Sequence, residues 1–203
     1  SKGMSANDPL LLSEDVNVRK RFTEMIDDTL KAVFDSFSDD SAFSGIDPYE
    51  LRESICSLGF LPEHGMGFDK VLEETKEKIL PHLLRTWSTK YMPHLHSPVL
   101  TETICSELMI SCFNDSMDSW DQGPAATEVE ESMIHGLAEL YGFPLETSDG
   151  CFTSGGSQSN ISAIVAARDR YCMERFGWDV KMNGLPPEYS KLRVYTSEIS
   201  HFS

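Results

Sequence analysis

Two adjacent glycines separate a short strand-like run from a long stretch of small residues, and this arrangement constrains the fold more than any other feature. The residues Cys-Phe-Thr at 151–153 predict a short strand, Gly155-Gly156 predicts a turn, and residues 157–176 predict a buried helix. Residues 192–196, Leu-Arg-Val-Tyr-Thr, predict another strand. A strand, a turn, a helix and a second strand form a βαβ unit, which predicts a parallel sheet in an α/β domain.

The residues before this region predict helices. Apolar side chains recur every three or four positions over residues 18–37, which indicates an amphipathic helix. Asp47 ahead of Pro48 predicts a capped helix that stops at Gly59. A third helix is expected over residues 68–87, kinked at Pro81 because proline removes a backbone donor.

This pattern divides the chain into two predicted regions. Residues 1–88 form a helical arm, whose aromatic stripes are expected to pack on the body or on a second subunit as a dimerisation segment. Residues 89–203 begin a larger domain, with helices expected over 100–113 and from Thr127 to Gly142. A parallel sheet needs more strands than this region supplies, so we expect the sequence to be the front part of a longer protein.

Charge and composition exclude several classes of protein. The 203 residues include 33 acidic and 17 basic side chains, a formal net charge of -16, which disfavours nucleic acids and anionic membranes as partners. No apolar run approaches the roughly 18 residues of a membrane span, and the first eight residues lack a signal segment, so a cytoplasmic protein is expected. Five cysteines without a Cys-x-x-Cys pair predict reduced, mostly buried thiols.

The paired-glycine turn has two interpretations from its residues alone. Glycines and the free N–H groups of a helix start suit a phosphate, and Ser157 adds a hydroxyl donor. A tight turn with serine caps explains the same residues equally well. The segment is not a P-loop, because it lacks Gly-Lys. Ser159 replaces the second glycine of a G-x-S-x-G elbow, which disfavours a serine hydrolase.

Three segments resemble one family. Thr-Ser-Gly-Gly-Ser-Gln-Ser-Asn at 153–160, followed by Ala-Ala-Arg at 166–168, resembles the phosphate-binding segment of the pyridoxal-phosphate-dependent group II amino-acid decarboxylases. Residues 196–203 resemble that family's next landmark, S-x-x-x-H-x-S. His-Leu-His at 94–96 with Ser-Met-Asp-Ser-Trp-Asp-Gln at 116–122 is similar to the bacterial L-2,4-diaminobutyrate decarboxylase branch, although Asp115 stands where an amide is more common.

The resemblance implies a fold and a chemistry. It implies a fold type I, aspartate aminotransferase-like large domain with a parallel-rich mixed sheet, preceded by the helical arm, and pyridoxal 5'-phosphate as the cofactor. It also implies the following site residues: cofactor binding by Gly155, Gly156, Ser157 and Gln158, a catalytic His201 stacked on the pyridine ring, and a substrate pocket lined by His94, His96 and Trp120.

The implied activity is that of a homodimeric carboxy-lyase of amino-acid metabolism. It would convert L-2,4-diaminobutyrate to 1,3-diaminopropane and CO2, and acidic residues at 115–121 favour such a cationic substrate if they face the pocket. A glutamate or aspartate decarboxylase of the same group remains an alternative. The family's cofactor-linking lysine and ring-pairing aspartate are expected beyond Ser203, so the 203-residue piece alone is expected to be inactive, and a non-catalytic fragment is a further alternative.

Neither candidate metal site is supported by its spacing. His94 and His96 lack a nearby third ligand, and the aspartates at 115, 118 and 121 do not meet the spacing of a calcium loop. No metal is therefore expected.

Overall fold

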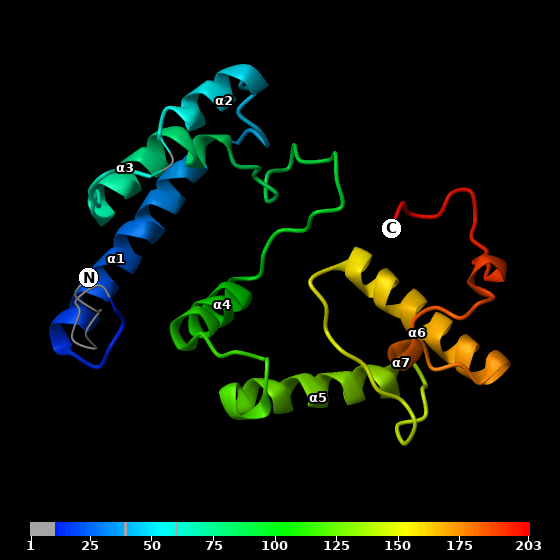
Figure 1. Ribbon diagram of the computed structural model, residues 1–203. Helices are drawn as coiled ribbons and strands as arrows, with labels where there is room; N and C mark the ends of the chain where they lie inside the picture. The colour runs from blue at the N-terminus through cyan, green and yellow to red at the C-terminus, as the bar shows by residue number, and fades with distance from the viewer. Residues whose placement is uncertain (1–10, 39, 60) are drawn as a thin grey trace. The chain divides into compact units, whose positions relative to one another are not determined.

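The computed structural model describes residues 11–38, 40–59 and 61–203, and the chain divides into two compact units, Ser1–Asn114 and Asp115–Ser203. The prediction of no signal segment concerns the first eight residues, which lie outside the described ranges. In the described part the α-helices are α1 (Val16–Asp35), α2 (Pro48–Cys56), α3 (Phe68–Lys78), α4 (Thr101–Phe113), α5 (Pro124–Leu140), α6 (Gly156–Phe176) and α7 (Val180–Asn183), shown in Figure 1.

The first two helices of the arm follow the sequence prediction. Helix α1 is capped by Asp15, whose Oδ1 accepts the N–H of Asn17 at 2.8 Å, and it packs against α3. The predicted cap of α2 is confirmed, because Oδ1 of Asp47 accepts the N–H of Tyr49 at 2.8 Å. Both caps satisfy N–H groups that have no partner within the helix.

The third helix differs from the prediction. It does not kink at Pro81 and continue to residue 87, but ends at Lys78 and is followed by the 3-10 turn η2 (Leu80–His82). Proline lacks an N–H and its ring collides with the carbonyl four residues earlier, so the α-helical pattern cannot pass through it. The residues after the turn are free to make other contacts.

Those residues fasten the end of the arm to an earlier loop. The buried Arg85 donates from Nη1 to the Ser41 hydroxyl at 3.1 Å, and the buried Ser88 hydroxyl donates to the carbonyl of Asp40 at 2.8 Å. Trp87 packs on Phe37, with ring centroids 4.1 Å apart. Hydrogen bonds and an aromatic contact thus join residues 85–88 to residues 37, 40 and 41, which lie far earlier in the sequence.

In the second unit, α5 begins earlier than predicted. Thr127 was expected to cap it, but the helix starts at Pro124, with Gly123 as the capping residue. The fixed φ of Pro124 suits the first helical position, and the Thr127 hydroxyl donates instead to the carbonyl of Gly123 at 2.8 Å. The predicted end is confirmed, since Gly142 turns the chain with φ +74° after Leu140.

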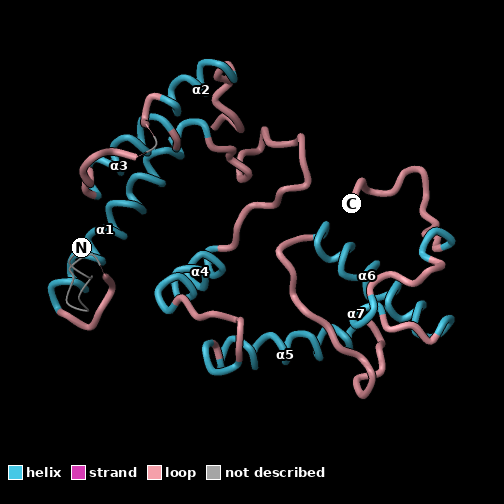
Figure 2. The backbone as a smooth tube through the Cα atoms, in the orientation of Figure 1, coloured by secondary structure: helices cyan, strands magenta, loops and turns pink. Residues whose placement is uncertain are grey.

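Helix α6 has the predicted extent, but the described residues do not form the sheet that was expected beside it. It ends at Gly177, which adopts the left-handed conformation with φ +62°. The two predicted strands, 151–153 and 192–196, are not formed, and Figure 2 shows no strand in the described chain. A strand is defined by its ladder partner, and none lies beside them. Residues 156–167 of α6 are correspondingly exposed rather than buried, and Ile161 is 56% exposed.

The thiol prediction is confirmed in one respect and wrong in another. All five cysteines are free, as expected, but only Cys172 is buried. Searching the described helices for a segment long and apolar enough to cross a bilayer finds none.

Candidate functional site

The paired-glycine turn leads directly into the N-terminus of α6. Gly155 precedes the helix in an extended conformation, and no side chain caps the N–H groups of the first turn. A Cβ added to Gly155 or to Gly156 would meet no other atom within 4 Å, so the space above this turn is open. Free N–H groups at the positive end of a helix dipole, facing open space, are suited to an anion.

Hydroxyl groups hold the turn in shape. The Thr153 hydroxyl donates to the carbonyl of Gly155 at 3.1 Å and lies 2.6 Å from the Ser159 hydroxyl, one helical turn further on. These contacts connect the residue before the turn to the helix after it. The glycines are therefore held by their neighbours while their own N–H groups stay available.

The Gln158 side chain also forms hydrogen bonds that hold the turn in shape. Its Oε1 accepts both the hydroxyl and the peptide N–H of Ser154, at 2.5 and 3.3 Å. The side-chain carbonyl of Gln158 is thus used inside the turn, and the peptide N–H groups of residues 156–158 remain for a ligand. The Ser157 hydroxyl makes no hydrogen bond to the described residues and can donate to the same ligand.

The structure brings His201 to this end of α6. The Asn160 side-chain amide donates from Nδ2 to the Ser203 hydroxyl at 2.8 Å, and that hydroxyl lies 2.7 Å from Nδ1 of His201. In Figure 1 the C-terminal residue lies beside the start of α6. The two sequence landmarks, the glycine turn and His201, are therefore neighbours in space.

Helix α5 supports the segment that precedes the turn and also holds Trp120. The Glu130 carboxylate accepts the peptide N–H of Phe152 at 2.8 Å, and the Glu128 carboxylate accepts Nε1–H of Trp120 at 3.0 Å. Trp120 opens the 3-10 turn η3 (Trp120–Gln122) and is 61% exposed, so its ring has a free face.

His94 and His96 lie together in the first unit. Their ring centroids are 5.8 Å apart, and Nδ1 of His96 lies 2.9 Å from the Tyr91 hydroxyl. No cluster of three metal-ligating side chains occurs in the part of the chain that the structure describes. Because the glycine turn belongs to the other unit, the shared substrate pocket expected for His94, His96 and Trp120 stays a prediction.

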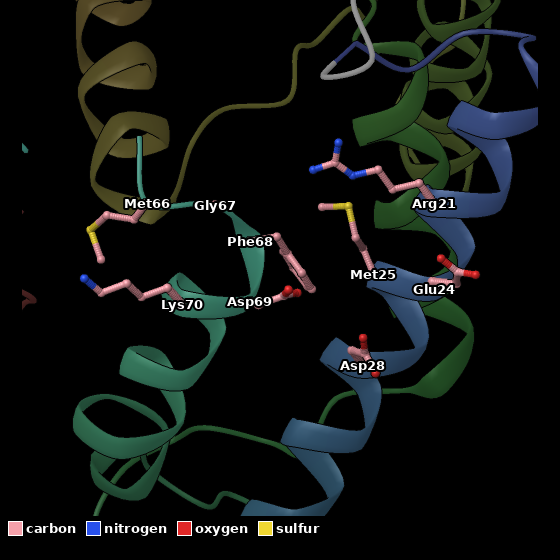
Figure 3. A pocket seen from close by; sticks show the side chains of 9 residues that line it. All are labelled: Arg21, Glu24, Met25, Asp28, Met66, Gly67, Phe68, Asp69 and Lys70. Atoms are coloured by element: carbon pink, nitrogen blue, oxygen red, sulfur yellow. The ribbon is translucent and has the colours of Figure 1, made fainter. Parts of the chain in front are cut away.

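A separate pocket of about 540 Å³ lies in the first unit between α1 and the start of α3. Figure 3 shows Phe68 of α3 pointing toward Met25 of α1. Two cations and three carboxylates line it: Arg21, Lys70, Glu24, Asp28 and Asp69. These charges nearly balance, and none of the sequence motifs contributes to this pocket.

A comparison with protein-family models identifies the chain. The model described as the pyridoxal-dependent decarboxylase conserved domain matches residues 59–203. The chain belongs to this decarboxylase family. The range that matches the pyridoxal-dependent decarboxylase domain contains every site residue expected from the sequence. These are the glycine turn, His94, His96, Trp120 and His201.

Individual relatives of this decarboxylase chain agree with the family. Proteins named L-2,4-diaminobutyrate decarboxylase are 32% identical in Acinetobacter baumannii and 36% identical in Rhizobium meliloti, each over 95% of this chain. The chain spans 39% and 36% of their respective lengths.

A solved structure shares the backbone path as well. It is described as the glutamate decarboxylase domain of diaminobutyrate-pyruvate transaminase and L-2,4-diaminobutyrate decarboxylase from Vibrio parahaemolyticus. It is 31% identical and superposes with a TM-score of 0.89 over 96% of this chain and 42% of the solved one. This likeness supports fold type I for the decarboxylase chain, while the details of the expected sheet are not seen in the described residues.

The cofactor of this decarboxylase family is pyridoxal 5'-phosphate, and the turn fits it. The open space over Gly155 and Gly156 leaves room for a phosphate to approach the backbone, where a side chain would stand in the way. The uncapped N–H groups supply donors for the phosphate oxygens, and the imidazole of His201 supplies an aromatic surface close by.

Sequence reasoning missed several residues that shape the site. Asn160 and Ser203 belong to the quoted motifs, yet their mutual hydrogen bond joins residues 43 positions apart. The motif letters could have drawn attention to Asn160. Glu130 had no signal of its own, because an acidic residue on a helix is normally solvated.

Proposed function

We propose that the protein containing this chain is a pyridoxal 5'-phosphate-dependent carboxy-lyase that converts L-2,4-diaminobutyrate to 1,3-diaminopropane and CO2. The observation that carries the proposal is the combination of an open, uncapped glycine turn with His201, held at the same end of α6 through Asn160 and Ser203. Two relatives named for this activity support the choice of substrate.

In this proposal the residues of the chain bind and orient. Peptide N–H groups of Gly156, Ser157 and Gln158 hold the phosphate, helped by the hydroxyl of Ser157. His201 covers one face of the ring. The bound cofactor supplies a conjugated, electron-accepting ring, which stabilises the negative charge left on the α-carbon when its bond to the carboxylate breaks. CO2 leaves as that bond breaks, and the α-carbon would then take up one proton.

We also propose His94, His96 and Trp120 as walls of the substrate pocket. Trp120 is supported by its exposed ring and by its bond to Glu128, which fixes the orientation of the indole. The two histidines are supported by their mutual contact and by the Tyr91 hydroxyl. Acidic residues at 115–121 would add attraction for the second ammonium group of the substrate.

A homodimer joined through the arm, residues 1–88, is part of the same proposal, with residues 89–203 as the first part of the cofactor-binding domain. The arm exposes large aromatic side chains, with Phe34 62% exposed and Trp87 46% exposed. A patch of this kind is commonly covered by a partner. The free thiols are consistent with a cytoplasmic location, since cytosolic thiols are kept reduced.

The proposal is tested on the intact natural protein loaded with pyridoxal 5'-phosphate. Diamine release from L-2,4-diaminobutyrate is compared with decarboxylation of L-glutamate and L-aspartate. The diamino acid is expected to have the highest kcat/KM, and a preference for either dicarboxylic acid would overturn the substrate assignment.

The role of His201 is tested with two variants. His201→Ala is expected to weaken cofactor retention and greatly lower turnover, whereas His201→Phe keeps an aromatic face and is expected to retain more cofactor. Cofactor content is measured by absorbance after gel filtration. Wild-type activity in His201→Ala would contradict the role assigned to this residue.

A further inference from the structure

Asn160 and His201 are connected through Ser203 by a chain of short hydrogen bonds. Nδ2 of Asn160 donates to the Ser203 hydroxyl at 2.8 Å, and the same hydroxyl lies 2.7 Å from Nδ1 of His201. The peptide N–H of Ser203 also donates to that Nδ1, at 3.2 Å. Two groups of one residue therefore converge on a single ring nitrogen.

The direction of these bonds determines where the ring proton lies. A peptide N–H can only donate, so in this geometry Nδ1 of His201 accepts and carries no proton of its own. The Ser203 hydroxyl already accepts from Asn160, which leaves its hydrogen free to point at Nδ1. Both contacts are satisfied only when the neutral imidazole carries its proton on Nε2.

We propose that Asn160 and Ser203 are positioning residues that hold His201 as its Nε2–H tautomer and fix the rotation of the ring. This inference rests on the proposed function, in which His201 covers the cofactor. It adds that Nε2–H is the one donor that the neutral ring presents at the site. Neither residue touches the cofactor in this scheme, because both act through His201.

A simpler role would be that of a hook fastening residues 201–203 to α6. The variant Asn160→Asp distinguishes control of the His201 tautomer from simple attachment of residues 201–203. A carboxylate still binds the Ser203 hydroxyl, so a hook is kept. The carboxylate accepts the hydroxyl hydrogen, however, and Ser203 then presents a lone pair to Nδ1. That lone pair opposes the longer peptide contact of 3.2 Å, so the proposed relay predicts that part of the population shifts toward a proton on Nδ1, whereas a hook predicts no change.

The experiment uses the intact natural protein without cofactor, with ¹⁵N-labelled histidine. Long-range ¹H–¹⁵N correlation spectra show which ring nitrogen of His201 is protonated, and His201→Gln assigns its signals. The wild type and Ser203→Thr, which keeps the hydroxyl, are expected to show a protonated Nε2. Asn160→Asp is expected to move population toward a protonated Nδ1, and Ser203→Ala, which keeps only the peptide N–H contact, is expected to show a smaller excess of protonated Nε2.

Kinetics of the loaded enzyme give a second readout. Asn160→Asp is expected to lower kcat by about 10- to 100-fold, by analogy with the loss of partners that orient metal-bound histidines, with KM little changed. A wild-type tautomer and a wild-type kcat in Asn160→Asp would overturn the relay. Failure of the wild type to bind pyridoxal 5'-phosphate or to release diamine would overturn the proposed function instead, and the cofactor-free spectra would still decide the relay.

Discussion

The Glu130 carboxylate of α5 accepts the peptide N–H of Phe152 at 2.8 Å, across 22 residues of chain. This bond fastens the segment that leads into the glycine turn to a helix that begins far earlier in the sequence. Thr153, the next residue, is the one whose hydroxyl braces the turn. The geometry of the candidate cofactor site therefore depends on a side chain outside the site.

Removing this acceptor is expected to loosen the turn. Glu130→Leu leaves the N–H of Phe152 to water, and a hydrogen bond of about 0.5–1.5 kcal/mol corresponds to about 2- to 10-fold faster amide exchange at that residue. Hydrogen–deuterium exchange of peptides covering 148–156 measures this. Glu130→Gln keeps an acceptor oxygen and serves as the control. Equal exchange in both variants would show that the bond does not hold the segment.

A methyl group on Gly156 is expected to harm cofactor binding without harming the fold. The added Cβ meets no atom within 4 Å, so the chain itself accommodates it, but it occupies the space proposed for the phosphate. Losing one charge-assisted hydrogen bond of about 1.5–3 kcal/mol would raise the Kd for pyridoxal 5'-phosphate about tenfold or more. Absorbance titration measures the Kd, and thermal unfolding of the cofactor-free protein is expected to be unchanged.

Gly123→Ala is the contrasting control, because a methyl group at Gly123 is expected to destabilise the fold. A Cβ there would lie 2.8 Å from the carbonyl oxygen of Ser116, so Gly123→Ala must displace backbone at the start of α5. Overpacking of this kind costs about 1–3 kcal/mol and lowers Tm. If Gly156→Ala lowered Tm as much as Gly123→Ala, the space above the glycine turn would not be a binding site.

Reversing a charge beside Trp120 is expected to affect a cationic substrate selectively. Asp118→Lys replaces an attraction of about 1 kcal/mol at about 4 Å in water by a repulsion of the same size, a change of about 2 kcal/mol or about 30-fold in KM for L-2,4-diaminobutyrate. Glu63→Lys makes the same charge change in the arm. Steady-state kinetics on both variants are compared at low and moderate salt. An unchanged KM in Asp118→Lys would remove the acidic segment 115–121 from substrate recognition.

The cap of α2 gives a prediction about stability alone. Asp47→Ala removes the acceptor for the N–H of Tyr49 and is expected to cost about 1 kcal/mol. Asp47→Ser restores a capping oxygen and is expected to recover most of that loss. Chemical denaturation of the cofactor-free protein measures both. Catalytic constants of the loaded enzyme should be equal in the two variants.

Local signals in the sequence predicted most helices well. Asp47 with Pro48 marked the start of α2, and periodic apolar residues marked α1, because capping and amphipathicity depend on neighbours within a few positions. The start of α5 was misplaced because the capping-box spacing at Thr127 was given more weight than Pro124. Proline at the first helical position is the stronger constraint there.

Long-range features were beyond the reach of the sequence. Residues 151–153 and 192–196 have strand-like composition, but a strand exists only when another strand pairs with it, and the described residues provide no partner. The motif letters indicated a phosphate turn and a ring-facing histidine. They did not indicate that Asn160 and Ser203 would join the two, because a hydrogen bond over 43 residues leaves no local pattern.

The bond between Asn160 and Ser203 also bears on the entropy of cofactor binding. A ligand held at residues 156–158 by its phosphate and at His201 by its ring crosslinks two distant segments, and closing such a loop costs conformational entropy that grows with the logarithm of its length. Here a hydrogen bond has already closed the loop before the ligand arrives. The chain thus bears the ordering cost during folding, and more of the contact energy remains as affinity.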